Sequence, residues 1–592
     1  MYQKLSNKEK ENQSPQQLWY ILAGKSRETV MSASVSNEQL GIIKRAVARI
    51  AKKYKVAGFC LYGSRVAGYS RPDSDFDVIV VLQDYPYAVK YIYTVEQNMK
   101  ISALVVDLAR FRKDAESSFL GEFVIGRLLH IYEPVQNKEL FELLEVVYKK
   151  RVILDEIYNI VKSTNVLSTQ INFPLEYIMF SKVRYRSLLY PNAAYSYFQI
   201  YAGKNSQYNI EFALNGYQKA LEGILTYDKE LLNTERSDGA IQISERRIDV
   251  QKNQKIASLK LTKKLQEFSS YFIHAYAGRH TLHHVVKEAE SKISRHKANR
   301  VTLPKFISNP KDFYWHLPEG HIITDEKNWL DKLAKLNGFS KYVISKKRVL
   351  GTRNNTTVLV IIEDSNNHNV SKSLVVKNMA TTKRASWRNL GRLSSPMNRS
   401  KVHPLFRLGN EYRALRHIRS MALHSPMIQS IVLDKAILVC EFIEGELLSD
   451  ILKRFCSNKN NSDQNLEWIN MAGQHIGKIH AHKCTLGDIK PSNLIISNNI
   501  LYFTGLDQFN FNSDYPLLDI IYFLGSTLEG ISANTFVAKQ ILEEFFEGYS
   551  KQMPADLIKK FVRSEYFSEV LHTNFSPTIA ETIKEELVRS SK

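Results

Sequence analysis

The first third of the chain alternates between helical and strand-like spacing of apolar residues. Between residues 38 and 54, apolar side chains recur every three or four positions, at Leu40, Ile43, Val47 and Ile50. This spacing predicts an amphipathic helix. Short apolar runs at 59–62, 78–81 and 102–106 have the length of buried strands. The interval between the second and third runs is long enough for a further helix, so the order predicts an α/β domain.

From residue 140 to about 295 the apolar spacing is helical, with clear stretches at 208–225 and 261–277. Pro304, Pro310 and Pro318 then interrupt every regular pattern, which predicts a linker. We therefore expect an α/β domain, an all-α bundle and, beyond the linker, further globular structure.

Residues between the first two predicted strands form a candidate site for phosphate and metal. Gly63 and Ser64 carry little side-chain bulk, so backbone N–H groups and a hydroxyl can approach a triphosphate. Asp75 and Asp77 flank Phe76 where the second strand begins. Residues two apart in a strand face the same side, so both carboxylates can reach the same Mg²⁺ ions while Phe76 points into the core. An ordinary turn before the strand is the alternative interpretation.

A third carboxylate, Asp107, ends the third apolar run. The combined pattern of Gly-Ser, Asp-x-Asp and a later Asp resembles the minimal branch of the DNA polymerase β-like nucleotidyltransferases. By this resemblance, Gly63 and Ser64 bind the triphosphate of a nucleotide. Its implied metal ligands are Asp75, Asp77 and Asp107. Asp107 is also expected to help to deprotonate the attacking hydroxyl.

A second set of candidate residues lies in the last third of the chain. Asp488 and Asn493 stand five residues apart just before an apolar strand, which is the spacing of a kinase catalytic loop. In that loop the Asp orients the acceptor hydroxyl and the Asn binds Mg²⁺. Three earlier residues occur in the order expected of a kinase. They are a strand lysine, its partner on a helix and a hinge residue: Lys377, Glu411 and Glu441.

This order resembles the atypical small kinases over residues 339–549, in particular the kinase of the tRNA threonylcarbamoyladenosine complex and its Rio-like relatives. The resemblance implies an ATP site in which Lys377 and Asp488 are catalytic. The match breaks at the Asp-Phe-Gly position, because Gly505 stands where the metal-binding Asp belongs and Asp507 follows two residues later. Two interpretations stay open: Asp507 substitutes as the metal ligand, or the domain is a pseudokinase.

Together these patterns predict four segments: a nucleotidyltransferase palm at 36–139, a helical bundle at 140–299, a linker at 300–335 and a two-lobed protein-kinase-like domain at 336–585. The predicted fold class is α/β plus all-α plus α+β.

The composition points to a polyanionic partner. The formal net charge is +21 at pH 7, which favours RNA, tRNA included, as that partner. The four cysteines have no paired spacing, so we expect reduced thiols in a cytoplasmic protein. We expect no membrane association, because no apolar run is long enough to span a bilayer and the first 17 residues lack a signal-peptide pattern.

Several weaker signals accompany these motifs. Arg279 precedes His284 by five residues, the spacing of the Arg-x(4–6)-His ribonuclease motif of HEPN helical domains. The stretch 383–401 is basic without an acidic residue, as in an RNA contact or a solvated insertion. Tyrosines crowd residues 185–217, where bundle packing is favoured over base stacking. Gly351 is the one glycine in a plausible phosphate-covering hairpin.

We therefore expect a Mg²⁺-dependent nucleotidyltransferase that moves a nucleoside monophosphate from ATP or another NTP to a hydroxyl acceptor, fused to an ATP-binding kinase or pseudokinase. These residues do not choose among RNA, a protein and a small molecule as the acceptor, and they do not define the oligomeric state. The alternative hypotheses are a serine/threonine protein kinase as the main activity, and an RNA-binding scaffold or toxin–antitoxin-like regulator with degenerate sites.

Overall fold

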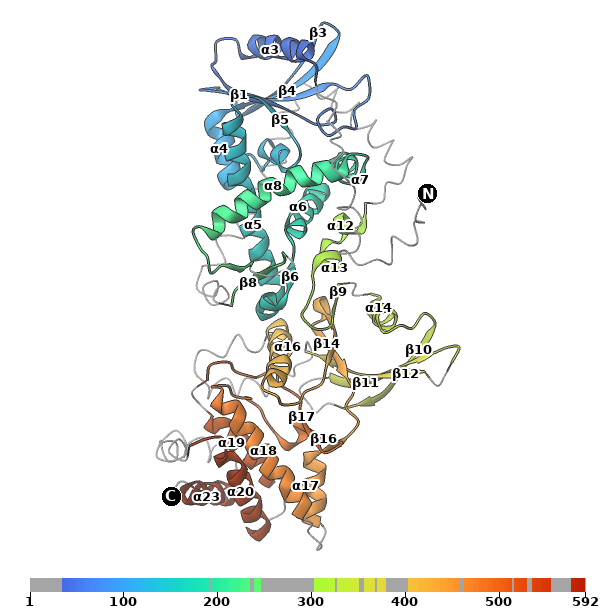
Figure 1. The fold of residues 1–592 in the computed structure, drawn as a ribbon, viewed down its shortest axis with the longest axis vertical. Coiled ribbons are helices and arrows are strands. Elements are labelled where there is room, and N and C mark those ends of the chain that lie inside the picture. Colours follow the sequence, from blue (N-terminus) through green and yellow to red (C-terminus); the bar gives the residue numbers. More distant parts are fainter. Residues whose placement is uncertain are drawn as a thin grey trace. The chain divides into compact units, whose positions relative to one another are not determined.

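The computed structural model describes residues 35–190, 193–234, 239–245, 303–324, 327–350, 356–367, 370–379, 403–457, 463–513, 516–529, 535–554 and 577–590. It divides into two compact units (Figure 1). Unit 1 extends to Lys162 and includes Ile171–His316, and unit 2 consists of Ser163–Gln170 and the chain from Leu317. The ribonuclease motif at Arg279 and His284, the basic stretch 383–401 and Gly351 lie outside the described residues.

The described part of unit 1 opens with the predicted helix α3 (Asn37–Ala51), which begins at a capping box formed by Ser36 and Gln39. A five-stranded sheet follows, here called the palm sheet, in the order β3-β4-β2-β1-β5. Its strands are β1 (Val56–Tyr62), β2 (Phe76–Leu82), β3 (Val89–Glu96), β4 (Met99–Asp107) and β5 (Glu133–Gln136).

The three predicted strands are confirmed, but the expected intervening helix is wrong. The interval holds β3, which pairs antiparallel with β4. Polar and apolar residues mix along β3 and much of it is only partly buried, as in an edge strand with one solvated face. Because of that mixture, β3 contains no continuous apolar run of the kind that predicts a buried strand.

Helices make up most of the rest of unit 1 as far as its residues are described. They are α4 (Leu108–Ser117), the short 3₁₀ helix η1 (Ile125–Leu129), α5 (Lys138–Thr164), α6 (Leu175–Leu189), α7 (Ala194–Ala202) and α8 (Ser206–Leu225). A small sheet joins β6 (Asn172–Phe173), β8 (Ile241–Ile243) and β7 (Leu232–Asn233). Within the tyrosine-rich stretch, Tyr197, Tyr201 and Tyr217 are buried, as bundle packing requires.

Part of the stretch predicted as a linker is ordered structure of unit 1. The helices α12 (Lys305–Ser308) and α13 (Pro310–Tyr314) pack on α6. The ring of Tyr314 stacks on Phe180 at 5.9 Å, and Asn172 and His316 exchange two backbone hydrogen bonds. Pro304 and Pro310 start these short helices, because the first residues of a helix do not need the backbone N–H group that proline lacks.

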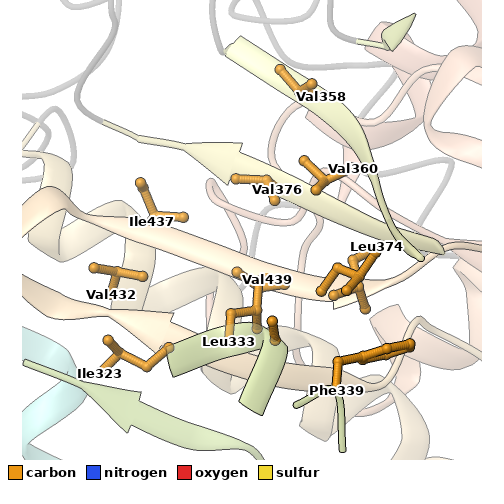
Figure 2. Packing of buried hydrophobic residues seen from close by; sticks show 12 residues of the cluster. Ile323, Leu333, Phe339, Val358, Val360, Leu374, Val376, Val432, Ile437 and Val439 are labelled. Carbon is orange, nitrogen blue, oxygen red and sulfur yellow. The ribbon is translucent and has the colours of Figure 1, made fainter. Parts of the chain in front are cut away.

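Unit 2 contains a six-stranded sheet in the order β10-β11-β12-β14-β13-β9. Its strands are β9 (His321–Ile323), β10 (Tyr342–Val349), β11 (Thr356–Asp364), β12 (Ser371–Asn378), β13 (Ile428–Val432) and β14 (Ile437–Glu441). Alternate apolar residues of these strands, such as Val360, Val376 and Val439, pack with Leu333 of α14 (Trp329–Leu336) and with Phe339 to form one core (Figure 2).

The other elements of unit 2 are mainly helical. Among the described residues they are η2 (Asn165–Gln170), α16 (Pro404–Ser420), η5 (Leu433–Lys435), α17 (Leu448–Ser457), α18 (Asp463–Ala481), η6 (Pro491–Asn493), α19 (Leu517–Glu529), α20 (Thr535–Ser550) and α23 (Pro577–Ser590), with a small sheet of β15 (Glu446–Leu447), β16 (Leu494–Ser497) and β17 (Ile500–Phe503). The predicted mixed fold class is confirmed: an α/β sheet with helices in unit 1 and an α+β arrangement in unit 2. Among the described helices, none is both long and apolar enough to span a bilayer.

Candidate functional site

The turn after β1 depends on a glycine that no other residue can replace without strain. Gly63 has a φ of 82°, and a Cβ atom at this position would overlap the carboxylate of Asp77. The N–H groups of Ala67 and Tyr69 donate to the carbonyls of Gly63 and Ser64, both at 3.0 Å. The turn is therefore closed by its own backbone, with the Asp77 carboxylate directly against it.

Arg65 attaches this turn to the beginning of β2. Its Nε donates to the Ser74 carbonyl at 3.1 Å, and its guanidinium lies 4.1 Å from the centre of the Phe76 ring. Phe76 is 4% exposed, whereas Asp75 and Asp77 on either side of it are only partly buried. The strand alternation thus puts both carboxylates on the accessible side, beside the turn.

The structure does not bring Asp107 to this pair. In the parallel register of β2 and β4, Asp77 lies beside Ser102, and Asp107 is five residues further along β4. That offset corresponds to roughly 16 Å along a strand. The Asp107 carboxylate instead accepts hydrogen bonds from the N–H groups of Tyr85 (3.0 Å) and Arg110 (3.1 Å), the second as the N-cap of α4. An aspartate that ends an apolar run is equally the signature of a helix start.

Sequence reasoning missed a cation beside this site. Arg127 of η1 lies 5.6 Å from the ring centre of Tyr62, the last residue of β1, and donates to the Tyr91 hydroxyl at 3.3 Å. Burial raises the pKa of Tyr62 well above its usual value, and the nearby Tyr91 and Asp77 raise it further. Arg127 comes from a short helix outside the strand motif, so no spacing rule links it to Asp77.

The backbone that carries Arg127 is held by a buried carboxylate, Glu122. Its carboxylate pairs with Arg151 (2.9 Å), Lys182 (2.8 Å) and Arg186 (3.4 Å) and accepts a hydrogen bond from a tyrosine hydroxyl. Burial alone would raise the pKa of Glu122, but the three cations hold that pKa well below its usual range. Arg186 also donates to the Glu122 carbonyl at 3.2 Å, which ties the segment before η1 to α6.

In unit 2, Lys377 and Glu411 come together. Lys377 follows Val376 on β12, so it faces the side of the sheet opposite the core of Figure 2. There it forms an ion pair with Glu411 of α16, with side-chain exposures of 14% and 1%. Burial alone would lower the pKa of Lys377, but Glu411, with smaller contributions from Cys440 and Asp507, raises it overall.

The predicted catalytic loop is anchored by a residue that sequence reasoning did not assign, Asp519 of α19. Its buried carboxylate accepts hydrogen bonds from the N–H groups of Leu486 and Gly487 and lies 3.1 Å from His480 Nε2. The only sequence signal was an aspartate interrupting the apolar run 515–528. Downstream of this anchor the Asp488 side chain is 39% exposed and pairs with a lysine two residues later at 2.8 Å.

The metal-binding end of this loop lacks its expected carboxylate. Gly505 has a φ of 70°, and a Cβ there would lie 2.9 Å from Asn493 Nδ2. That amide also donates to the Asp488 carbonyl at 3.0 Å. Asp507 is 7% exposed, and its carboxylate accepts a hydrogen bond from Arg407 Nε at 2.7 Å. Burial raises the pKa of Asp507, with Arg407 opposing that shift.

The remaining predicted residue, Glu441, ends β14. Its Oε1 atom accepts a hydrogen bond from the Met427 N–H at 2.8 Å, so the side chain joins the ends of two neighbouring strand segments.

Comparison with known proteins agrees with both parts of this description. Residues 45–133 match the family model described as polymerase beta nucleotidyltransferase. A 154-residue stretch is 27% identical to a probable bifunctional tRNA threonylcarbamoyladenosine biosynthesis protein of Methanococcus vannielii, and a 141-residue stretch is 27% identical to KEOPS complex subunit Bud32 of Pyrococcus abyssi. The chain joins a nucleotidyltransferase domain to a kinase-like domain.

The matched stretches are 26% and 24% of this chain, and they span 26% of the Methanococcus protein and 60% of the Pyrococcus protein. A solved structure of WaaP in complex with acyl carrier protein aligns with 45% of this chain and 98% of its own length, at 12% identity and a TM-score of 0.26.

The nucleotidyltransferase and kinase-like domains differ in their fit to a metal ion. In the described parts of the chain no three His, Cys, Asp or Glu side chains are arranged as a metal site. Asp75 and Asp77 nevertheless offer two oxygen donors on one face, and Mg²⁺ is commonly bound by one or two carboxylates with substrate phosphates and water. In the kinase-like domain, the Asn493 side chain lies beside Gly505, which has no carboxylate, and the Asp507 carboxylate accepts a hydrogen bond from Arg407. The residues present therefore fit a metal in the first domain and do not in the second.

Proposed function

We propose that the nucleotidyltransferase domain transfers a nucleoside monophosphate from an NTP to a hydroxyl acceptor and releases pyrophosphate. The observation that carries this proposal is the contact between the Gly63 turn and the Asp77 carboxylate. It puts a backbone suited to a triphosphate beside carboxylates suited to a cation. Two such functions side by side are what attack at an α-phosphorus requires.

Each residue then has a distinct role. The backbone at Gly63 and Ser64 binds the triphosphate, and Arg65 holds that turn against β2 through the Ser74 carbonyl. Asp75 and Asp77 would hold Mg²⁺, which when bound stabilises charge on the attacking and leaving oxygens. Ser102 lies beside Asp77 where a third carboxylate was expected. We therefore propose that solvent water accepts the proton of the acceptor hydroxyl and that Asp107 has a structural role.

The test is incubation of the full chain with each α-³²P-labelled NTP, Mg²⁺ and a mixture of total RNA and protein. We expect transfer of the label to one macromolecular fraction. Asp77→Asn should abolish transfer and keep the fold, because the amide has the same shape without the charge. Asp73→Asn is the matched control, since Asp73 is an exposed carboxylate of the same loop. Equal transfer by the wild type and Asp77→Asn contradicts the proposal.

For the kinase-like domain we infer nucleotide binding with little or no phosphoryl transfer. The pair of Lys377 and Glu411 supports binding of phosphates. Gly505 leaves no carboxylate at the usual metal-ligand position, and Asp507 is paired with Arg407, whereas phosphoryl transfer depends on a metal held there. An active kinase that uses Asp507 is the second candidate.

The two candidates differ in a direct measurement on the full chain. We expect ATP to raise the temperature of the unfolding transition of unit 2 equally with Mg²⁺ or EDTA, and γ-³²P-ATP to give no autophosphorylation. Lys377→Met should remove the effect of ATP on this domain. Autophosphorylation that disappears in Asp507→Asn would overturn the inference and support the active kinase.

RNA is the acceptor that we favour over a protein or a small molecule. The net charge of +21 suits a polyanion. Both relatives carry names from tRNA modification or from the KEOPS complex, which adds weight to RNA without defining the substrate.

A further inference from the structure

One row of side chains crosses the palm sheet at the level of Asp77. Tyr62 of β1 pairs with Asp77, Asp77 pairs with Ser102 of β4, and Ser102 pairs with Tyr93 of β3. Directly paired residues of neighbouring strands point to the same face of a sheet. Tyr93 therefore lies on the same face as Asp77, two strands away, which is about 10 Å.

Tyr93 belongs to an organised aromatic pair. Its ring stacks on Tyr91, two residues earlier on the same face, with centroids 6.2 Å apart and an angle of 19° between planes. Tyr91 is held from the other sides by an edge-to-face contact with Phe123 (5.9 Å) and by the hydrogen bond from Arg127. Tyr93 is 39% exposed. The pair thus presents an oriented aromatic surface to solvent, with its inner member fixed.

The geometry of the transfer reaction determines from which side of Asp77 the acceptor approaches. The Gly63 turn lies on the β1 side of Asp77 and Tyr93 lies on the opposite, β3 side. In an in-line displacement, the attacking and leaving oxygens lie on opposite sides of the phosphorus. With pyrophosphate leaving at the Gly63 turn, the acceptor hydroxyl arrives from the side of β4 and β3.

We propose that Tyr93, oriented by Tyr91, is a stacking platform for the terminal nucleobase of an RNA acceptor. Lys100 is an exposed cation on the same strand and the same face as Ser102, and it pairs with Val95 of β3, two residues from Tyr93 and on the same face. An aromatic ring next to a cation is the arrangement that binds single-stranded nucleic acid without reading its sequence.

This inference rests on the proposed nucleotidyl transfer. The ribose hydroxyl oxygen of the stacked nucleoside forms a bond to the α-phosphorus of the NTP. The bond from that phosphorus to its bridging oxygen breaks, pyrophosphate leaves with the electron pair, and the hydroxyl proton passes to water. Tyr93 takes no part in these bond changes; it positions the acceptor.

An RNA-binding assay tests the platform independently of the transfer reaction. The probe is a 5′-fluorescein single-stranded RNA with a normal 3′ nucleoside, compared with the same RNA whose terminal ribose lacks its base. Fluorescence anisotropy of the full chain without NTP should show tighter binding of the intact RNA by about 5- to 150-fold, the range of one base–aromatic stack. Tyr93→Ala should bind both RNAs alike, and Tyr93→Phe should keep the preference.

Tyr87→Ala is the matched control. Tyr87 is a 47% exposed tyrosine that packs on Tyr85 near the other end of the sheet. It should leave the preference for the intact RNA unchanged. In the transfer assay, Tyr93→Ala should raise KM for the RNA by a similar factor and leave KM for the NTP unchanged.

The outcomes separate the two proposals. Equal binding of both RNAs by the wild type, an unchanged preference in Tyr93→Ala, or label found only on protein would each overturn the platform. Absence of any transfer by the wild type would contradict the nucleotidyltransferase proposal, while a base preference that depends on Tyr93 would still support the platform.

Discussion

Replacing Glu122 with glutamine removes the only carboxylate that three cations of unit 1, one buried and two largely buried, share within ion-pair distance in the described structure. Breaking a buried ion pair by removal of one partner costs about 3–5 kcal/mol, because the remaining charge stays buried without compensation. A glutamine keeps the shape and one acceptor oxygen, so we expect Glu122→Gln to destabilise unit 1 by about 3 kcal/mol. For a domain of this size, that corresponds to a fall in unfolding temperature of roughly 6–12 °C.

The pH dependence of this contribution has a definite sign. The cations hold the pKa of Glu122 below its unfolded value, although burial opposes them. The stabilisation is therefore complete above the ordinary pKa of a glutamate and is lost as the pH falls through the lower pKa of the folded state. Glu122→Gln should remove this part of the acid sensitivity of unit 1.

Differential scanning calorimetry of the full chain at neutral pH measures the effect, with the transition of unit 2 as an internal reference. Glu142→Gln is the control, because Glu142 forms an exposed pair with Lys138 at 3.6 Å and such pairs are worth about 0–1 kcal/mol. A loss below about 1 kcal/mol for Glu122→Gln, or one no larger than that of the control, would refute the reasoning. Nucleotidyl transfer should also fall, since Glu122 supports the segment that carries Arg127.

Three further predictions concern single residues of either unit. Gly63→Ala should abolish nucleotidyl transfer with a stability loss of about 1–3 kcal/mol, because the φ of 82° and the Asp77 carboxylate oppose a Cβ, and normal transfer would contradict this. Burial lowers the pKa of His475 to about 4, so unit 2 should lose up to about 3 kcal/mol between pH 6.5 and 4; urea titrations of His475→Gln should show a flatter profile. Asp519→Asn should weaken the predicted catalytic loop by about 2–4 kcal/mol and increase hydrogen exchange at Leu486, and unchanged exchange would count against the anchor.

Local patterns in the sequence were sufficient wherever the determining interactions are themselves local. The helix at α3 follows from its capping box and apolar spacing, and the two sides of β2 follow from the alternation of Asp75, Phe76 and Asp77. The same holds for the glycine turn, since a left-handed φ restricts the residue regardless of its surroundings. These features depend on the steric and hydrogen-bonding preferences of neighbouring residues.

The tertiary structure decided which distant residues meet. Asp107 and Ser102 lie on one strand, and only the register of β4 against β2 determines that Ser102 reaches Asp77. That register is set by burial of the whole palm sheet, because a shift by one residue would turn every side chain of the strand to the other face. The amino-acid order carries no local trace of this choice.

The same reason applies to charges in both units. Asp507 was a metal-ligand candidate in the sequence, and its pairing with Arg407 arises from packing between segments that are 100 residues apart. Asp519 and Arg127 reach their sites through comparable long-range packing. A buried charge requires a partner, and the identity of that partner depends on which surfaces the hydrophobic cores bring together.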